Sequence, residues 1–185
     1  MLHRRSLIAA IATTPVLGLA ACRGDAAHVM MGMQVPRVRG TTTDGLGVDF
    51  AGLGKAALVR FWGLWCGPCM RDEPFWHETV EALRGRADLT VLSVHVGEAP
   101  DTGPSLAAWA ASQPPEARVP VVDDTTMAIM RAFQVPGTPT HILIDASGRI
   151  VEHAWAFKSS RAVRSFTRKV DYLLDRAVSG TAAGR

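Results

Sequence analysis

Two cysteines three residues apart carry the clearest chemistry in the sequence. Cys66 and Cys69 lie in the stretch WCGPC, where an apolar run at residues 57–62 gives way to a segment with helical spacing. Residues three apart at the start of a helix lie on one side, close enough for a disulfide. The free N–H groups and the positive end of the helix favour a thiolate at the first cysteine. We therefore expect Cys66 to be the attacking nucleophile and Cys69 to resolve the mixed disulfide that forms.

Other roles for this cysteine pair fit the sequence less well. A zinc site needs a second pair of ligands, and the sequence has no second CxxC and no closely spaced histidine pair. Covalent haem attachment would place a histidine at position 70, where Met70 stands. A purely structural disulfide across so short a loop would constrain the unfolded chain little. We therefore expect redox chemistry, with no cofactor and no metal.

Length and composition set the broad class. The chain has 185 residues, 48% of them hydrophobic and 20% charged, which suits one domain with a real core. This composition excludes a disordered chain, a collagen-like fibre and a multi-span membrane protein. The formal net charge is +3, but residues 1–21 contain Arg4 and Arg5 and no acid, so it falls to +1 without them. The basic balance therefore does not predict a nucleic-acid partner.

The N-terminus has the pattern of an export signal. The two arginines precede an apolar stretch at residues 7–20, which is shorter than the roughly 20 residues of a membrane span. The segment ends Leu19-Ala20-Ala21-Cys22, which resembles the lipobox of bacterial lipoproteins. That resemblance implies cleavage after residue 21 and a lipid on Cys22 that anchors the protein to a membrane surface. An ordinary signal peptide remains the alternative, and Sec and twin-arginine export both remain open.

The rest of the chain predicts one α/β domain with a mixed sheet. We expect a linker at residues 22–34, the domain at residues 35–180 and a frayed tail at residues 181–185. A turn at residues 43–45 and a short strand at residues 47–53 favour a hairpin before the main domain. Apolar runs and helical periods then predict strands at 57–62, 89–96, 119–122, 140–144 and 149–154, and helices at 75–83, 105–112, 126–133 and 162–177, the last stopping near Gly180.

Residues 61–69, FWGLWCGPC, followed by Pro74, resemble the active-site motif of the thioredoxin superfamily. With the preceding Gly54-Lys55 and the domain length, they resemble its membrane-tethered extracytoplasmic branch, the TlpA/ResA-like proteins that include cytochrome c maturation reductases. The likeness covers about residues 35–177. It implies a thioredoxin-like fold, a central mixed β-sheet flanked by helices. It also implies an extra strand and helix, at residues 100–122, between the CxxC helix and a cis-proline loop.

The resemblance also implies a surface for binding substrate. Thr138-Pro139, just before a predicted strand, matches the cis-proline loop, where backbone groups turned toward the cysteines pair with an extended substrate. Trp65, Gly67 and Pro68 would complete that surface. The alternative for the proline is an ordinary trans turn.

Two charged residues depart from the family pattern. Thioredoxins carry a buried acid in the strand before the motif, at the position of Arg60 here. The tethered branch often has glutamate three residues after the second cysteine, where this chain has Asp72. One helical turn from Cys69, Asp72 could accept that thiol's proton. It could equally be an acid favoured by the helix dipole in the first turns. Glu73 is a weaker candidate for the same role.

Two histidines could also influence the cysteines. His141 follows the proline loop by two residues and could tune the thiolate, although an outward-facing strand histidine is the commoner explanation. We interpret His95 as structural.

The function that these features favour is a membrane-anchored oxidoreductase at the periplasmic or extracytoplasmic face. It would reduce disulfides of exported clients, apocytochrome c or copper-site cysteines, with electrons from a membrane thiol donor. One alternative is an oxidase or isomerase that donates its disulfide. Another is a copper-binding assembly module that uses Cys66 and Cys69, with His141 as the distant ligand. The sequence leaves the client, the donor and the membrane open.

Overall fold

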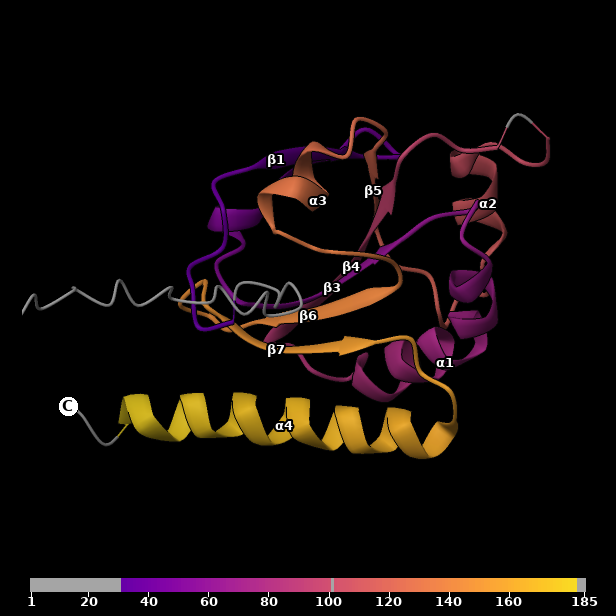
Figure 1. The fold of residues 1–185 in the computed structure, drawn as a ribbon. Helices are drawn as coiled ribbons and strands as arrows, with labels where there is room; N and C mark the ends of the chain where they lie inside the picture. Colours follow the sequence, from indigo (N-terminus) through magenta and orange to yellow (C-terminus); the bar gives the residue numbers. More distant parts are fainter. Residues whose placement is uncertain (1–30, 101, 183–185) are drawn as a thin grey trace, which may run out of the picture.

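The computed structural model describes residues 31–100 and 102–182 (Figure 1). The predicted signal peptide at residues 1–21, the lipidation site at Cys22 and most of the predicted linker lie outside these residues. Within them, no helix combines the length and the apolar character needed to cross a membrane.

A seven-stranded mixed sheet forms the centre of the molecule, in the order β2-β1-β5-β4-β3-β6-β7. Neighbours β5, β4 and β3 run parallel, and the remaining neighbouring strands pair antiparallel. The strands are β1 (Arg39–Thr42), β2 (Gly47–Asp49), β3 (Ala56–Trp62), β4 (Leu89–Val96), β5 (Val121–Asp124), β6 (Thr140–Ile144) and β7 (Ile150–Trp155).

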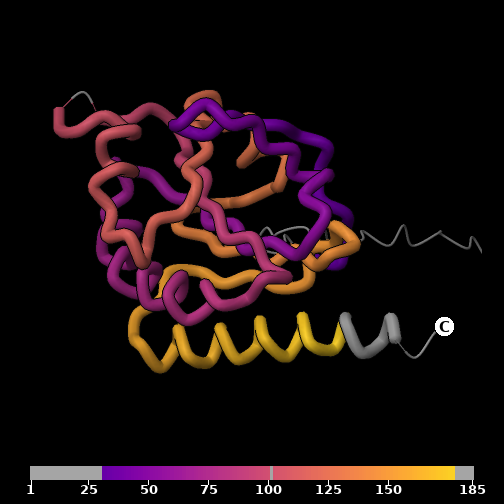
Figure 2. The backbone as a smooth tube through the Cα atoms, turned by 180° about the vertical axis from the view of Figure 1, so that it is seen from behind, coloured from indigo at the N-terminus to yellow at the C-terminus, as the bar shows by residue number. Residues whose placement is uncertain are grey.

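Helices cover both faces of the sheet. Long helices α1 and α4 pack together on one face, and both views show α4 running along that side of the molecule (Figures 1 and 2). Short helix α3 and a 3₁₀ turn at Phe50–Gly52 cover the other face. Helix α2 packs beside the first turn of α1. The helices are α1 (Gly67–Leu83), α2 (Leu106–Ser112), α3 (Ala128–Ala132) and α4 (Ser160–Ala182).

Strand β3 is completely buried, and its alternation sets the position of one charged residue. Successive side chains of a strand point to opposite faces of the sheet. The side of α1 and α4 receives Leu58, Arg60 and Trp62, so the guanidinium of Arg60 is held beneath α1. The opposite core receives Ala57, Val59 and Phe61.

Most of the predicted elements are present, and several limits differ. Strands β4 and β6 have the predicted ends, and α2 and β5 form the extra helix and strand between the CxxC helix and the proline loop. Helix α3 begins only at Ala128 because Met127 has φ 58°, a left-handed conformation that helix residues do not adopt. Helix α4 continues through Gly180 to Ala182.

The end of the predicted linker already contacts the domain. The N–H of Gly32 donates to the carbonyl of Ile150 at 2.8 Å, and Gln34 forms an isolated bridge with Arg149. Residues 31–34 therefore add to the edge of the sheet next to β7.

Phe133 anchors the core on the α3 side, so its truncation tests this packing. Its ring lies 5.4 Å from that of Phe50 and 5.3 Å from that of Phe61, and the side chain is fully buried. We expect Phe133→Ala to lower the free energy of unfolding by about 3–5 kcal/mol, measured by denaturant unfolding. Tyr172→Ala on the exposed side of α4 should change it by less than about 0.5 kcal/mol. Equal effects of the two substitutions would contradict this account of the core.

Candidate active site

The two cysteines form a disulfide at the N-terminus of α1. Cys66 is the N-cap residue, and its Sγ accepts a hydrogen bond from the N–H of Cys69 at 3.2 Å. Pro68 occupies the first turn, where a backbone N–H would have no partner within the helix. Cys66 is 4% exposed and Cys69 is not exposed. The positive end of α1 therefore faces Cys66, while Cys69 faces the protein interior.

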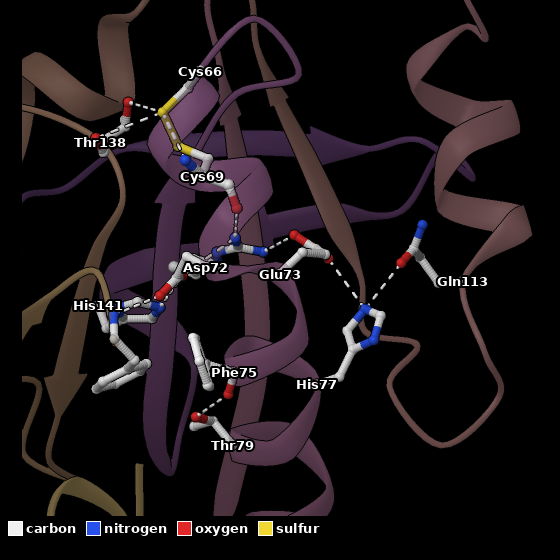
Figure 3. A network of polar contacts seen from close by, with 12 residues as sticks. Cys66, Cys69, Asp72, Glu73, Phe75, His77, Thr79, Gln113, Thr138 and His141 are labelled. Atoms are coloured by element: carbon white, nitrogen blue, oxygen red, sulfur yellow. Dashed lines mark hydrogen bonds and ion pairs between the residues drawn. A yellow bond between two sulfur atoms is a disulfide. The ribbon is translucent and has the colours of Figure 1, made fainter. Parts of the chain in front are cut away.

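The predicted proline loop lies directly against Cys66. The Thr138–Pro139 peptide bond is cis, the conformation that the family resemblance implies. The hydroxyl of Thr138 donates to Sγ of Cys66 at 3.3 Å, and the Thr138 carbonyl oxygen lies 3.6 Å from the same sulfur (Figure 3). Two segments 72 residues apart in sequence thus meet at one sulfur atom.

An apolar groove runs past the disulfide. Trp65 is half-exposed at its edge, and its indole N–H donates to the carbonyl of Val96 at 2.7 Å, which fixes the ring. The structure brings together four of the five predicted substrate-binding residues here, and Pro139 adjoins the groove through its neighbour. The described lining consists of Trp65, Cys66, Gly67, Pro68, Val96, Met127, Met130, Pro136, Gly137 and Thr138.

The methionines of this groove were not predicted from the sequence. Met127 and Met130 belong to the start of α3, about 60 residues from the cysteines. Asp124 places them, since its carboxylate accepts the N–H groups of Ile129 and Met130 at 3.0 and 2.8 Å. No spacing in the sequence signals that this turn folds against the CxxC motif.

Asp72 is buried on the inner side of α1, one turn after Cys69. Its side chain has no exposed surface, and Oδ1 accepts the backbone N–H of Phe157 at 2.6 Å. Oδ2 lies 3.4 Å from a guanidinium nitrogen of Arg60 and 3.4 Å from Nε2 of His141. The acid therefore belongs to an interior polar network and not to the solvated face of the helix.

Arg60 holds the centre of that network. Its Nη1 donates to Glu73 at 2.7 Å, and its Nη2 donates to the Cys69 carbonyl at 3.1 Å. The guanidinium also lies 5.3 Å from the ring centres of Trp62 and Trp76. The sequence identified this arginine only as a departure from a family pattern. Its partners were not predictable because they lie 9 to 13 residues away in another element.

The expectation that His141 faces outward is wrong. Its side chain has no exposed surface and stacks on Phe157, with ring centres 4.5 Å apart. Strand β6 lies between β3 and β7, and α1 and α4 cover the face toward which His141 points, so no side of the residue reaches solvent. Burial lowers the pKa of His141, and the nearby carboxylate of Asp72 opposes that shift without reversing it.

His95 supports the loop that carries the cysteine motif. Its Nε2 accepts the backbone N–H of Leu64 at 3.1 Å, and its ring packs edge-on against Trp62. Burial lowers the pKa of His95 more than the charge of Asp123 raises it, which favours the neutral ring. These contacts agree with a structural role.

Comparison with known families identifies the family of this chain. The model of the Redoxin family matches residues 30–164, which include the disulfide, the proline loop and the buried network. The chain belongs to the Redoxin family. Its fold is thioredoxin-like, a mixed sheet flanked by helices.

Similar proteins carry names from thiol–disulfide chemistry. The thiol-disulfide oxidoreductase ResA of Geobacillus kaustophilus is 31% identical over 97 residues, 52% of either chain. ResA of Bacillus subtilis is 28% identical over 111 residues, 60% of this chain and 59% of that one. The chain thus matches little more than half the length of these relatives. A Chlorobium tepidum structure that carries the name thiol:disulfide interchange protein DsbE has a TM-score of 0.62 at 21% identity, covering 78% of this chain and 98% of its own.

The buried histidines predict a loss of stability in weak acid. The pKa values of His95 and His141 are lowered below 6.5 in the folded protein, so the unfolded chain binds more protons. Their contribution to stability is complete above about pH 6.5 and is lost as the pH falls toward the folded values, by at most about 1.4 kcal/mol per pH unit for each histidine.

Chemical denaturation between about pH 7.5 and pH 5.5 measures this slope. The double variant His95→Gln/His141→Phe removes both proton sites, keeps an acceptor for Leu64 and keeps an aromatic ring on Phe157. We expect a shallower slope for this variant. A slope equal to that of the natural protein would show that other groups cause the pH dependence.

Proposed function

We propose that this protein is an extracytoplasmic thiol–disulfide oxidoreductase that reduces disulfides of exported proteins through Cys66 and Cys69. The observation that carries the proposal is the position of the disulfide. It lies at the N-terminus of α1, in the wall of an apolar groove, with Thr138 against the outer sulfur. A helix N-terminus favours a thiolate on the residue that caps it, and the groove offers space for a client beside that residue.

The proposed reaction transfers two electrons from the dithiol to the client. The Cys66 thiolate attacks one sulfur of a client disulfide, the client S–S bond breaks, and the second client sulfur leaves as a thiolate that takes a proton from water. The Cys69 thiol then loses its proton and attacks Sγ of Cys66. The client is released with both sulfurs reduced, and the protein is left with the Cys66–Cys69 disulfide, the form described above.

Asp72 is the proposed acceptor of the Cys69 proton. It follows Cys69 by three residues on one face of α1, and both side chains are buried on the sheet side. A carboxylate held away from water one helical turn from a buried cysteine is suited to general-base catalysis. The second proposed role belongs to the groove, where Trp65, Gly67, Pro68, Thr138 and Pro139 would bind an extended client segment.

The reductive direction and the location rest on the resemblance and on the N-terminal pattern. The Gly-Pro dipeptide between the cysteines resembles that of reducing thioredoxins, and relatives are named ResA. Clients would be apocytochrome c or copper-site cysteines, and a thiol donor in the membrane would restore the dithiol. A lipid on Cys22, after removal of residues 1–21, would hold the protein at the membrane surface.

Trapping tests the reaction and identifies the client. In Cys69→Ala the resolving thiol is absent, so clients should stay joined to Cys66 as mixed disulfides that reducing agent releases. Non-reducing electrophoresis and mass spectrometry of the adducts from the producing bacterium measure this. Cys66→Ala, which lacks the nucleophile, is the matched control and should trap at least about tenfold less, because Cys66 lines the groove and Cys69 has no exposed surface.

Two results would contradict the reductase. One is equal trapping by both variants, which would show that Cys66 is not the attacking nucleophile. The other is a reduction potential at or above about −180 mV, the value of protein disulfide isomerase, since such a protein donates its disulfide instead.

Membrane attachment depends on a single residue in this proposal. Cys22→Ser removes the only thiol that the lipobox offers for acylation, so we expect the protein to move from the membrane fraction to the soluble fraction of the envelope. Fractionation with metabolic labelling by a fatty acid measures both effects. Unchanged labelling and membrane association of Cys22→Ser would contradict a lipid anchor at this residue.

A further inference from the structure

Arg60 is a fully buried charge directly beneath the cysteine pair. Its guanidinium, at the middle of β3, contacts the Cys69 carbonyl, Asp72 and Glu73 (Figure 3). A buried charge costs stability unless partners surround it, and an apolar residue of similar size is often no worse for folding. The disulfide exchange described above uses neither Arg60 nor Glu73. A functional role would explain why a charged residue is buried at this position.

The charges around the guanidinium come from two elements. Helix α1 contributes the carboxylates of Asp72 and Glu73, and β6 contributes His141, whose pKa burial lowers, so that its ring is neutral near pH 7. The aromatic faces of Trp62 and Trp76 complete the surroundings. Arg60 is thus the one side chain with a permanent positive charge in contact with the described surroundings of Asp72.

Arg60 is the charged partner of the Asp72 carboxylate. The carboxylate has no exposed surface, and besides Arg60 its close partners are one backbone N–H and a neutral histidine. A buried carboxylate is costly unless cations and hydrogen-bond donors surround it, and a nearby cation also favours the thiolate form of a cysteine. The guanidinium is therefore the group that holds this carboxylate in the interior.

One nitrogen of Arg60 also ties the acid to the cysteine. Nη2 lies 3.1 Å from the Cys69 carbonyl oxygen and 3.4 Å from Oδ2 of Asp72. The other arm is fixed by Glu73, whose second oxygen lies 3.2 Å from Nε2 of His77. The planar guanidinium holds these groups in a geometry that a single ammonium could not reproduce.

We propose that Arg60 is a positioning residue for the second half of the reaction, which holds the Asp72 carboxylate in place relative to Cys69 so that the carboxylate can take the Cys69 proton. Arg60 transfers no proton and touches neither sulfur. The inference rests on the proposed role of Asp72 as the base, and it adds that the Arg60 guanidinium supports this role.

Reaction of the reduced protein with dithiobis(nitrobenzoate) separates the two halves of the reaction. Attack by Cys66 forms a mixed disulfide and releases one coloured nitrothiobenzoate, and attack by Cys69 then closes the protein disulfide and releases the second. The second phase is intramolecular, so its rate does not depend on reagent concentration. The full chain with Cys22→Ser is used, because Cys66 and Cys69 are then its only thiols.

The variants remove the cation, the acid or both. Arg60→Met removes the charge, and Arg60→Lys keeps a charge but not the planar guanidinium. Asp72→Asn removes the base, and Arg60→Met/Asp72→Asn removes both members of the ion pair. Arg86→Met is the matched control, since Arg86 likewise pairs with carboxylates, those of Asp88, Asp171 and Asp175, in a network that does not include the cysteines.

We expect Arg60→Met to slow the second phase about tenfold or more at pH 7 and to move its pH profile upward by about one unit or more, with the first phase changed less than about threefold. Arg60→Lys should fall between Arg60→Met and the natural residue. Asp72→Asn and the double variant should be equally slow, because the arginine acts through the acid. Arg86→Met should leave both phases unchanged.

If Arg60→Met does not fold, Arg60→Lys and the double variant, which has no carboxylate at position 72, carry the test. A second phase of natural rate and pH profile in the folded Arg60 variants, with Asp72→Asn slow, would overturn the role of Arg60 alone. A natural second phase in Asp72→Asn would overturn both the base and the residue that acts through it. Neither result would affect client trapping by Cys66, which measures the proposed function separately.

Discussion

A charge in the dry interior must be surrounded by partners, and the contact between Arg60 and Asp72 imposes that requirement on three elements at once. Strand β3 supplies the cation, α1 supplies the carboxylate, and the segment between β7 and α4 supplies the N–H of Phe157 that caps the carboxylate. Their relative placement is therefore fixed by hydrogen bonding as well as by apolar packing. The disulfide sits on top of this junction, with Cys66 at the groove and Cys69 toward the ion pair.

The sequence predicted the parts of the fold that depend on local patterns. The runs at residues 89–96 and 140–144 have β-rich apolar stretches with clear ends, and both strands appear within those limits. The cysteine motif likewise has a local meaning, because its geometry needs only the first turn of a helix. The start of α3 was harder to predict, because it depends on the left-handed backbone conformation of Met127. Methionine is not a residue type that indicates this conformation.

The polar network could not be predicted because its meaning is set by tertiary contacts. Arg60 interrupts an apolar strand, and the sequence of that strand does not indicate that a carboxylate on α1 pairs with this arginine. His141 has apolar neighbours on only one side in the sequence, and its burial follows from the covering helices. Asp72 had two explanations, and burial of its carboxylate favours a place in the interior network over a purely dipolar one.

The two sides of the groove beside the disulfide differ in flexibility. Trp65 is tied to Val96 by its indole N–H and Thr138 is held against Cys66, so this side is rigid. Met127 and Met130 face it with unbranched thioether chains, which change rotamer at little cost and fit irregular shapes. A client peptide bound there, as in the proposed function, would have its backbone path set by the rigid side, while the methionine side would adapt to different client side chains.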